Sequence, residues 1–348
     1  MKVVEPSRLR LWWVAVAFGV LGFTAVIAIG FGAVAIDPGE ILRSLLDRLP
    51  FVDVETGLNE RQEAILWQIR MPRIVLGGLV GATLALSGGA YQGSFRNPLA
   101  DPYLLGVAAG AGLGAILAFA YLPATTGWPI GPLPLLAFLG GLGGVALTYL
   151  VGYSVRAGRT SVTLILAGVA VAAFLTALQT YLLQRESETL RQVYGWILGR
   201  LTTVGWGEVL LILPYVIVAG VLVLGARRRL DVLSVGDEEA RALGVDAGRV
   251  RLVVVLAATL GTAAVVAVSG LIGFVGIIVP HTIRIVFSTS YKVVLPLAVI
   301  YGAAFLIAAD LIARTVVSPG ELPIGVVTAF FGAPFFAFVL RSSRGIGA

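Results

Sequence analysis

The chain has 348 residues, of which 58% are hydrophobic and only 13% charged, so a water-soluble fold could not bury its apolar surface. Its net charge of +6 does not indicate a nucleic-acid partner, because basic residues in membrane proteins usually mark the cytoplasmic side. With no cysteine, one histidine and two methionines, it has few soft ligands for a bare transition metal. We expect one all-α integral membrane domain over residues 1–348, surrounded by lipid, with no metal site and no nucleic-acid partner.

Ten apolar stretches follow one another along the chain, each close to the about 20 residues that a helix needs to cross a bilayer. The run of residues 251–287 is nearly twice that length, so it must turn back once, and Ser269-Gly270 is the predicted corner. An even number of spans places both termini on one side of the membrane. The predicted spans are residues 11–36, 72–92, 103–122, 131–152, 162–183, 208–226, 251–268, 271–288, 294–313 and 323–340.

The basic residues predict which side that is. When the N-terminus is placed in the cytoplasm, most lysines and arginines fall in the inner loops and tails, so we expect both termini to be cytoplasmic. On the outer side, loop 37–69 should be solvated and partly helical. Residues 186–207 should form a short helix on the outer surface, with Trp196 and Trp206 at the membrane interface.

Glycines recur every four residues within several predicted spans. Gly106, Gly110 and Gly114 follow this spacing, as do Gly140 and Gly144. Small residues at this interval let two helices approach closely, and we favour that interpretation over a glycine-lined path for a solute.

The inner loop of residues 227–250, between the sixth and seventh spans, is the most informative polar segment. Three consecutive acids, from Asp237 to Glu239, begin a short predicted helix, where negative charge suits the helix dipole. The apolar face of that helix would include Ala240 and Leu243. Two interpretations stay open at this point: a surface that a soluble partner grips, or an ordinary solvated loop.

The inner turn of residues 95–106 contains two prolines, which bar a regular helix and hold Asn97 and Asp101 in an extended conformation. A stiff loop of this kind suits the mouth of a pore. A tight connector between two spans explains the same residues equally well.

At the outer side, Arg70 and Arg73 stand three residues apart where the second span begins, and we expect both to face water. They either anchor the helix at the interface or serve an outer partner, because outer arginines run against the usual charge distribution. Asp310 and Arg314 have the four-residue spacing of an intrahelical ion pair, which we favour over a proton relay. His281 is expected to make a polar contact between helices.

The sequence contains no evident catalytic constellation. It has no paired catalytic carboxylates, no nucleophile beside a base and no metal-ligand cluster. It also lacks the GxxxxGK[ST] phosphate loop, so the chain should not hydrolyse ATP in the usual manner. We expect a protein that is not an enzyme and draws energy from elsewhere.

Several strings together resemble one family, the membrane permease subunits of ABC importers for ferric siderophores, haem and cobalamin. The resemblance covers nearly the whole chain. It implies the type II ABC importer fold, a homodimer of subunits with ten transmembrane helices each, and a place in the bacterial cytoplasmic (inner) membrane. It also implies three partner subunits: an extracytoplasmic substrate-binding protein and two ATP-binding cassette subunits. The ATP-binding cassette subunits bind ATP and Mg, and this chain is expected to bind no cofactor itself. The strings are WQIRMPR, GATLALSGGAYQGSFRNPLADPYLLG, LILAGVAV, GWILG, EEARALGV, GLIGFVGIIVPHTIR, AADLIAR and ELPIGVVTAFFGAPFF.

The resemblance implies two docking surfaces. The family presents outer arginines to its binding protein, and the matching residues here are Arg70, Arg73 and Arg314. Its coupling helices dock into the ATPases on the inner side. The matching residues of that segment are Asp237, Glu238, Glu239, Ala240, Leu243 and Gly244.

A cytoplasmic gate is also implied. The family's gate matches Asn97 and Leu99 in the inner turn, together with Thr160 and Ser161 at the start of the fifth span. Thr163 is the alternative to one residue of that pair, because this chain has one residue more than some relatives before LILAG.

By this resemblance the chain moves a metal chelate from the binding protein into the cytoplasm by alternating access, with the coupling helices opening and closing the gates as ATP is bound. The alternative is a secondary transporter driven by an ion gradient. That class needs ionisable groups at mid-membrane and often an inverted internal repeat, and neither is clear in the sequence. The sequence does not indicate which chelate is carried.

Overall fold

The computed structural model describes residues 8–31, 36–48, 54–123, 130–154, 161–202, 205–317 and 320–343, and within these ranges it contains helices and no strand. Among the described residues, seven helices are long and apolar enough to cross a membrane by length and composition. They are α1 (Leu11–Gly30), α4 (Met71–Phe95), α6 (Pro132–Ser154), α7 (Ser161–Arg185), α9 (Gly207–Gly225), α12 (Ala247–Ser269) and α14 (Tyr291–Thr315).

Three further apolar helices are shorter or less regular: α5 (Val107–Tyr121), α13 (Val275–Val286) and α15 (Ile324–Ser343). Each of the ten overlaps one predicted span, so the chain is an all-helical, multi-pass membrane protein. Ten complete crossings remain a prediction. The short helices are α2 (Pro38–Asp47), α3 (Glu60–Ile65), α8 (Leu190–Ile197), α10 (Arg227–Leu233) and α11 (Asp237–Ala242).

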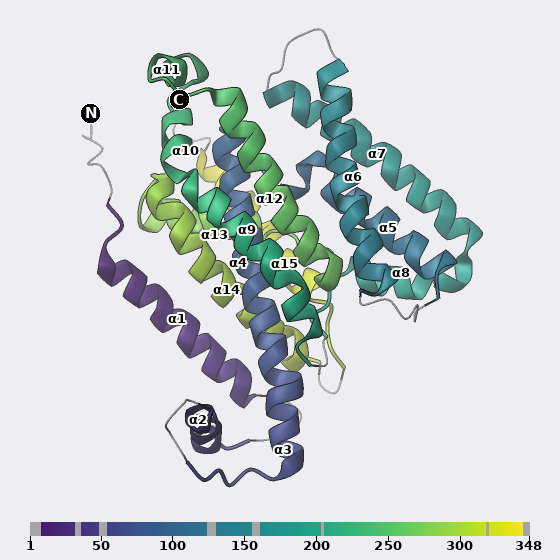
Figure 1. Cartoon of the computed structure of the whole chain (residues 1–348), viewed down its shortest axis with the longest axis vertical. Helices are drawn as coiled ribbons and strands as arrows, with labels where there is room; N and C mark the ends of the chain where they lie inside the picture. Colours follow the sequence, from purple (N-terminus) through teal and green to yellow (C-terminus); the bar gives the residue numbers. More distant parts are fainter. Residues whose placement is uncertain are drawn as a thin grey trace.

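The centre of the bundle is formed by α4, α12 and α14. In their most apolar stretches 78%, 72% and 67% of the residues are buried, whereas α1 and α9 have only 22% buried and so lie at the periphery. Helices α5 to α8 form a second group beside this centre, and α2 and α3 lie at the opposite end of the molecule from α11 (Figure 1). The fold therefore has two distinct ends: we call the end that carries α2 and α3 the predicted outer end, and the end that carries α11 the predicted inner end.

The glycine stripes mark helix contacts, as predicted. A Cβ atom on Gly110 would lie 2.0 Å from the carbonyl oxygen of Gly140, and one on Gly114 would lie 1.9 Å from that of Leu136. Helices α5 and α6 thus touch backbone to backbone at these positions, which only residues without a side chain permit.

The predicted corner at Ser269-Gly270 is confirmed. Helix α12 ends at Ser269, whose carbonyl accepts a hydrogen bond from the backbone N–H of Arg200 at 2.7 Å, and Gly270 has φ +69°. A Cβ atom on Gly270 would lie 2.0 Å from the carbonyl oxygen of Trp196. The turn therefore requires glycine both for its backbone conformation and for its space.

The outer segment of residues 186–207 does form a short helix, α8, but the expected interfacial position of Trp196 is wrong. Its side chain is only 1% exposed and packs in a cluster with Ala111, Ala115 and Val266. Trp206 is half-buried, and its indole N–H donates to the carbonyl oxygen of Trp67 at 3.2 Å. The segment folds into the bundle because burying an indole ring removes more apolar area from water than leaving it at an interface.

The outer loop is partly helical, as expected. Asp37 caps α2 by accepting hydrogen bonds from the backbone N–H groups of Gly39 and Glu40. Asn59 and Gln62 form a reciprocal capping box at the start of α3. A π-helical stretch, Leu66–Arg70, then joins α3 directly to α4.

Candidate functional site

The inner turn after α4 is rigid because its own side chains bond its backbone. Arg96 takes a left-handed conformation with φ +51°, which ends α4. The Asn97 side-chain oxygen accepts the backbone N–H of Leu99 at 2.9 Å, and Asp101 accepts that of Tyr103 at 2.8 Å. The predicted stiff loop is thus present, with Asn97 and Leu99 both half-buried.

The other predicted gate residues lie at the start of α7. Thr160 is outside the described residues, and Ser161 is the first residue of α7, with its side chain outside the description. Thr163 lines a cavity of about 280 Å³ together with Tyr149 and Arg251, between α6, α7 and α12. Neither Asn97 nor Leu99 lines this cavity.

Helix α11 lies at the inner end, and its two faces differ from the predicted pattern. Leu243 is 66% exposed and Val235 62% exposed, so both present apolar surface outward. Ala240 is 0% exposed and packs with Leu230 and Leu233 of α10. The expectation that Ala240 shares an exposed apolar face with Leu243 is wrong, because its side chain is buried against α10.

The acids of α11 are not equivalent either. Asp237 is half-buried and paired with Arg251 and Arg96, so it is not available as a free charge for a soluble partner. Glu238 and Glu239 are exposed. Gly244 ends the segment with φ +75° and open space around it, which accounts for a glycine there.

The expectation that Arg70 and Arg73 face water is wrong, because both side chains, like that of Arg314, turn inward and are largely covered by protein. Arg70 is 5% exposed and donates to the carbonyl oxygen of Ile29 at 2.7 Å. Arg314 donates to the carbonyl oxygens of Phe31, at 2.9 Å, and Ala28. The last carbonyls of α1 have no partner within the helix, so two cations at its C-terminal end satisfy them and suit its dipole.

Arg73 is held by two acids. Its guanidinium donates to Asp310 at 2.8 Å and to Glu321 at 2.9 Å, and its side chain is 12% exposed. The predicted pair of Asp310 with Arg314 is present, but at 3.6 Å it is the longer contact. Glu321, beyond the spans, has its pKa held below the usual range by Arg73. Arg73 thus ties α4 to α14 and to the loop before α15.

His281 does not make the expected polar contact within the described part of the chain. Its Nδ1 atom is buried without a hydrogen-bond partner there, and its ring meets Phe335 edge-on at 5.9 Å between centroids. An aromatic contact between α13 and α15 takes the place of the polar one.

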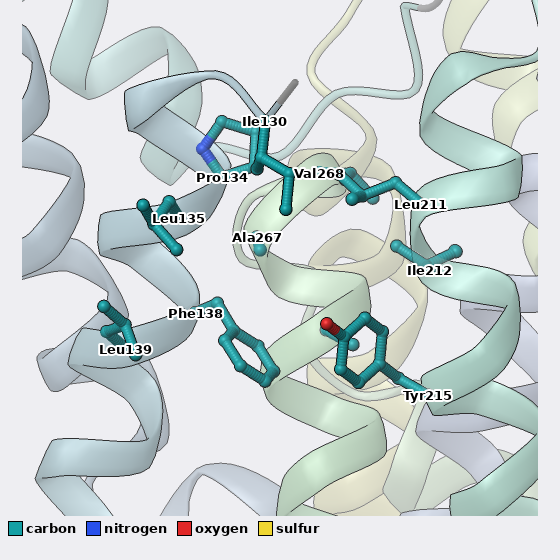
Figure 2. A pocket seen from close by; sticks show the side chains of 11 residues that line it. Ile130, Pro134, Leu135, Phe138, Leu139, Leu211, Ile212, Tyr215, Ala267 and Val268 are labelled. Carbon is teal, nitrogen blue, oxygen red and sulfur yellow. The ribbon is translucent and has the colours of Figure 1, made fainter. Parts of the chain in front are cut away.

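An apolar crevice of about 110 Å³ lies between α6, α9 and α12 (Figure 2). The rings of Phe138 and Tyr215 both line it, with their centroids 5.2 Å apart and their planes tilted by 53°. None of the eleven described residues that line it is acidic or basic, and none is a predicted site residue. We assign it no role in function.

The structure therefore has exposed apolar side chains at the predicted inner end, a rigid turn beside them, and a cluster of mutually paired charges at the predicted outer end. The sequence profile of the FecCD transport family matches residues 20–342. The chain belongs to the FecCD transport family.

Individual members of the FecCD family resemble this chain closely. It is 41% identical over 289 residues to the cobalamin import system permease protein BtuC of Halobacterium salinarum, covering 83% of this chain and 76% of that protein. It is 34% identical over 343 residues to the Fe(3+)-citrate import system permease protein YfmD of Bacillus subtilis, covering 98% and 97%. A solved inward-facing structure assigned to the metal-chelate type of ABC transporter matches with TM-score 0.80 and 30% identity, over 94% of this chain and 99% of that one. The resemblance drawn from the motifs is confirmed.

Two residues of this FecCD family chain escaped the sequence interpretation. Each forms an ion pair with a predicted site residue: Arg251 with Asp237, and Glu321 with Arg73. Spacing gives no hint of the second contact, which joins residues 248 positions apart. An available signal for Arg251 was its place at the very start of an apolar span, where a charge needs a partner.

Asp101 leads to a prediction for stability. Burial raises the pKa of its carboxyl from 3.8 to about 6, so the folded state binds the proton more tightly than the unfolded state does. Stability from this group is therefore full below the unfolded pKa and is lost as pH rises through about 6. Asp101→Asn keeps the acceptor for Tyr103 and cannot ionise, so we expect a gain of up to about 3 kcal/mol in unfolding free energy at neutral pH.

The measurement is thermal unfolding of the detergent-solubilised protein at pH values on either side of this titration. The difference between Asp101→Asn and the unchanged protein should disappear at the acidic end, below the unfolded pKa. An equal difference at both ends of the pH range would contradict the assignment.

Proposed function

We propose that this chain is the membrane permease of an ATP-driven importer, which moves a metal chelate from a substrate-binding protein into the cytoplasm. The observation that carries the proposal is the likeness, over 94% of the chain, to a transporter assigned to the metal-chelate type. Related permeases are named for cobalamin and for Fe(3+)-citrate, both of them chelated metals. The candidate cargo here is a ferric siderophore, haem or cobalamin.

The composition supports a chelated cargo over a bare ion. One histidine, two methionines and no cysteine leave few ligands that could strip a metal from its chelator. A pathway without strong ligands also lets a large solute leave as readily as it enters.

The assembly that we propose contains a second copy of this chain, two ATP-binding cassette subunits at the α11 end and a binding protein at the α2 and α3 end. Both termini would then be cytoplasmic. Leu243 and Val235 support the inner contact, because they expose apolar side chains on a polar segment outside the spans. The proposed cytoplasmic gate comprises Asn97 and Leu99 with Thr160 and Ser161, or with Thr163 in place of one of these two.

The outer arginines are proposed to contribute to docking of the binding protein, Arg73 by direct contact and the other two by positioning. Glu321 covers Arg73 from the exposed side, with 43% of its side chain accessible. A carboxylate on a docking partner could displace Glu321 from Arg73 with little loss, since exposed ion pairs contribute only about 0–1 kcal/mol. Arg70 and Arg314 would act by fixing the end of α1.

An ion-gradient-driven transporter is the less supported alternative. Asp310, the buried carboxylate among the described residues of the spans, is paired with two arginines, which makes it unsuited to picking up and releasing protons.

Uptake by cells tests the proposal. A strain lacking this chain should fail to accumulate one radiolabelled chelate from a panel of cobalamin, haem and ferric siderophores, and the unchanged chain should restore uptake. Restoration should be lost when the ATPase partner carries a substituted phosphate-loop lysine. Uptake that persists with that inactive ATPase and follows a proton or sodium gradient would support the alternative.

A further inference from the structure

Arginines from two elements meet at one carboxylate of α11. Arg251, in the first turns of α12, is 6% exposed, and its guanidinium donates to both carboxylate oxygens of Asp237, at 3.1 and 3.2 Å. Arg96, the residue after α4, lies 3.3 Å from the same carboxylate. Asp237 is the first residue of α11, so this short helix is fixed to α12 and to the end of α4 through a single side chain.

Arg251 also caps α4. Its Nε–H donates to the carbonyl oxygen of Ser94 at 2.8 Å, in the last helical turn, where carbonyls have no partner within the helix. The guanidinium is planar, so its N–H donors keep fixed positions relative to one another. When Asp237 moves and the guanidinium moves with it, the hydrogen bond to Ser94 must change its geometry as well. A displacement of α11 therefore shifts Arg251 and, through it, the last turn of α4.

The turn that follows is the one that carries the predicted gate residues. The backbone N–H of Asn97 donates to the carbonyl oxygen of Gln92 at 3.1 Å, which fastens the turn to the last helical residues of α4. On its other side, Arg251 lines the cavity of about 280 Å³ that Thr163 of α7 also lines. One arginine thus stands between α11 and both elements of the proposed gate.

We propose that the ion pair between Asp237 and Arg251, assisted by Arg96, transmits the displacement of α11 to the turn of residues 96–100 and to the start of α7. The inference rests on the proposed function, in which ATPase subunits move α11. Asp237 and Arg251 are positioning residues, because they act through the turn and touch no cargo. A role confined to holding α11 in place would lower stability or assembly and would leave unchanged the amount of chelate moved per ATP.

The test uses the full complex of this chain with its ATPase subunits and binding protein, reconstituted in lipid vesicles, and measures chelate imported per ATP hydrolysed. Asp237→Asn keeps the size and one acceptor oxygen but removes the charge, so the complex should assemble and hydrolyse ATP. We expect the ratio to fall about tenfold, the size of a typical coupling effect. Asp237→Asn combined with Arg251→Gln should be no worse than the more damaging single change, because both act through one contact.

Two further variants sharpen the result. Arg251→Lys keeps the charge but cannot reach Ser94 and Asp237 with one rigid fork, so it should lower the ratio as well. Arg228→Gln is the matched control: it lies on the neighbouring helix α10, is exposed, forms no ion pair among the described residues and does not line the cavity of Thr163 and Arg251, so its ratio should equal that of the unchanged complex.

An unchanged ratio for both Asp237→Asn and Arg251→Lys would overturn the inference, whether or not assembly is weakened. Failure of the proposed function would look different. In that case the unchanged complex would itself show no ATP-dependent import.

Discussion

Replacing Leu243 with Asp is expected to detach the ATPase subunits from the permease. The side chain is 66% exposed at the end of α11, so the substitution disturbs no core packing and the membrane domain should remain folded. In the proposed complex, the new carboxylate would be buried against the ATPase at the place where Leu243 makes an apolar contact. Burying an unpaired charge there costs several kcal/mol, which is enough to lower the affinity by more than about a hundredfold.

Co-purification through a tag on this chain measures the effect. Leu42→Asp is the matched control, because Leu42 is 57% exposed on α2, at the opposite end of the molecule, and should leave the ATPase ratio unchanged. A Leu243→Asp protein that retains the full complement of ATPase would contradict the docking proposal for α11.

Replacing Arg73 with Gln should destabilise the protein strongly. Asp310 is 3% exposed and takes its shortest contact from Arg73, at 2.8 Å. Removing one partner of a buried ion pair leaves the other charge uncompensated, which typically costs about 3–5 kcal/mol. Arg314 would remain beside Asp310, but its guanidinium is also engaged by the end of α1.

Thermal unfolding in detergent, combined with a second substitution, measures this loss. The double variant Arg73→Gln with Asp310→Asn removes the uncompensated charge and should recover most of the loss. Glu321→Gln should cost less than about 1 kcal/mol, because that pair is partly exposed. A double variant as unstable as Arg73→Gln alone would contradict the role given to Asp310.

These substitutions also bear on docking. Reversing the charges at Arg70 and Arg73 together would disrupt the end of α1 and the buried pair, so weaker binding-protein docking would not by itself establish a direct contact. Glu321→Gln is the cleaner variant. It frees the exposed edge of Arg73 and should leave docking equal or stronger.

Most of the fold could be predicted from the sequence because the signals are local. The positions of the apolar helices, the corner at Gly270 and the glycine contacts at Gly110 and Gly114 depend only on hydropathy, turn chemistry and spacing, and the structure confirms them, whereas only seven of the described helices reach the length of a full crossing. The approximate place of α11 also followed from its acids and the glycine after it.

The orientation of individual side chains was harder to predict, because it depends on partners far away in the chain. Arg73 and Asp310 are 237 positions apart, and Arg70 reaches back 41 positions to α1. Trp196 was placed at the interface by a tendency of tryptophans in general, whereas helices α5 and α12 provide a closed apolar site for its ring. Tertiary packing decided each of these cases.

In the proposed assembly, this chain is a conduit whose energy comes from separate ATPase subunits. The most direct measurement is chelate accumulation in sealed vesicles that contain either the chain alone or the chain with its ATPases and binding protein. Uphill accumulation should require the full complex and ATP, and imposed proton or sodium gradients should not replace them. Uphill uptake by the chain alone, driven by such a gradient, would contradict the claim.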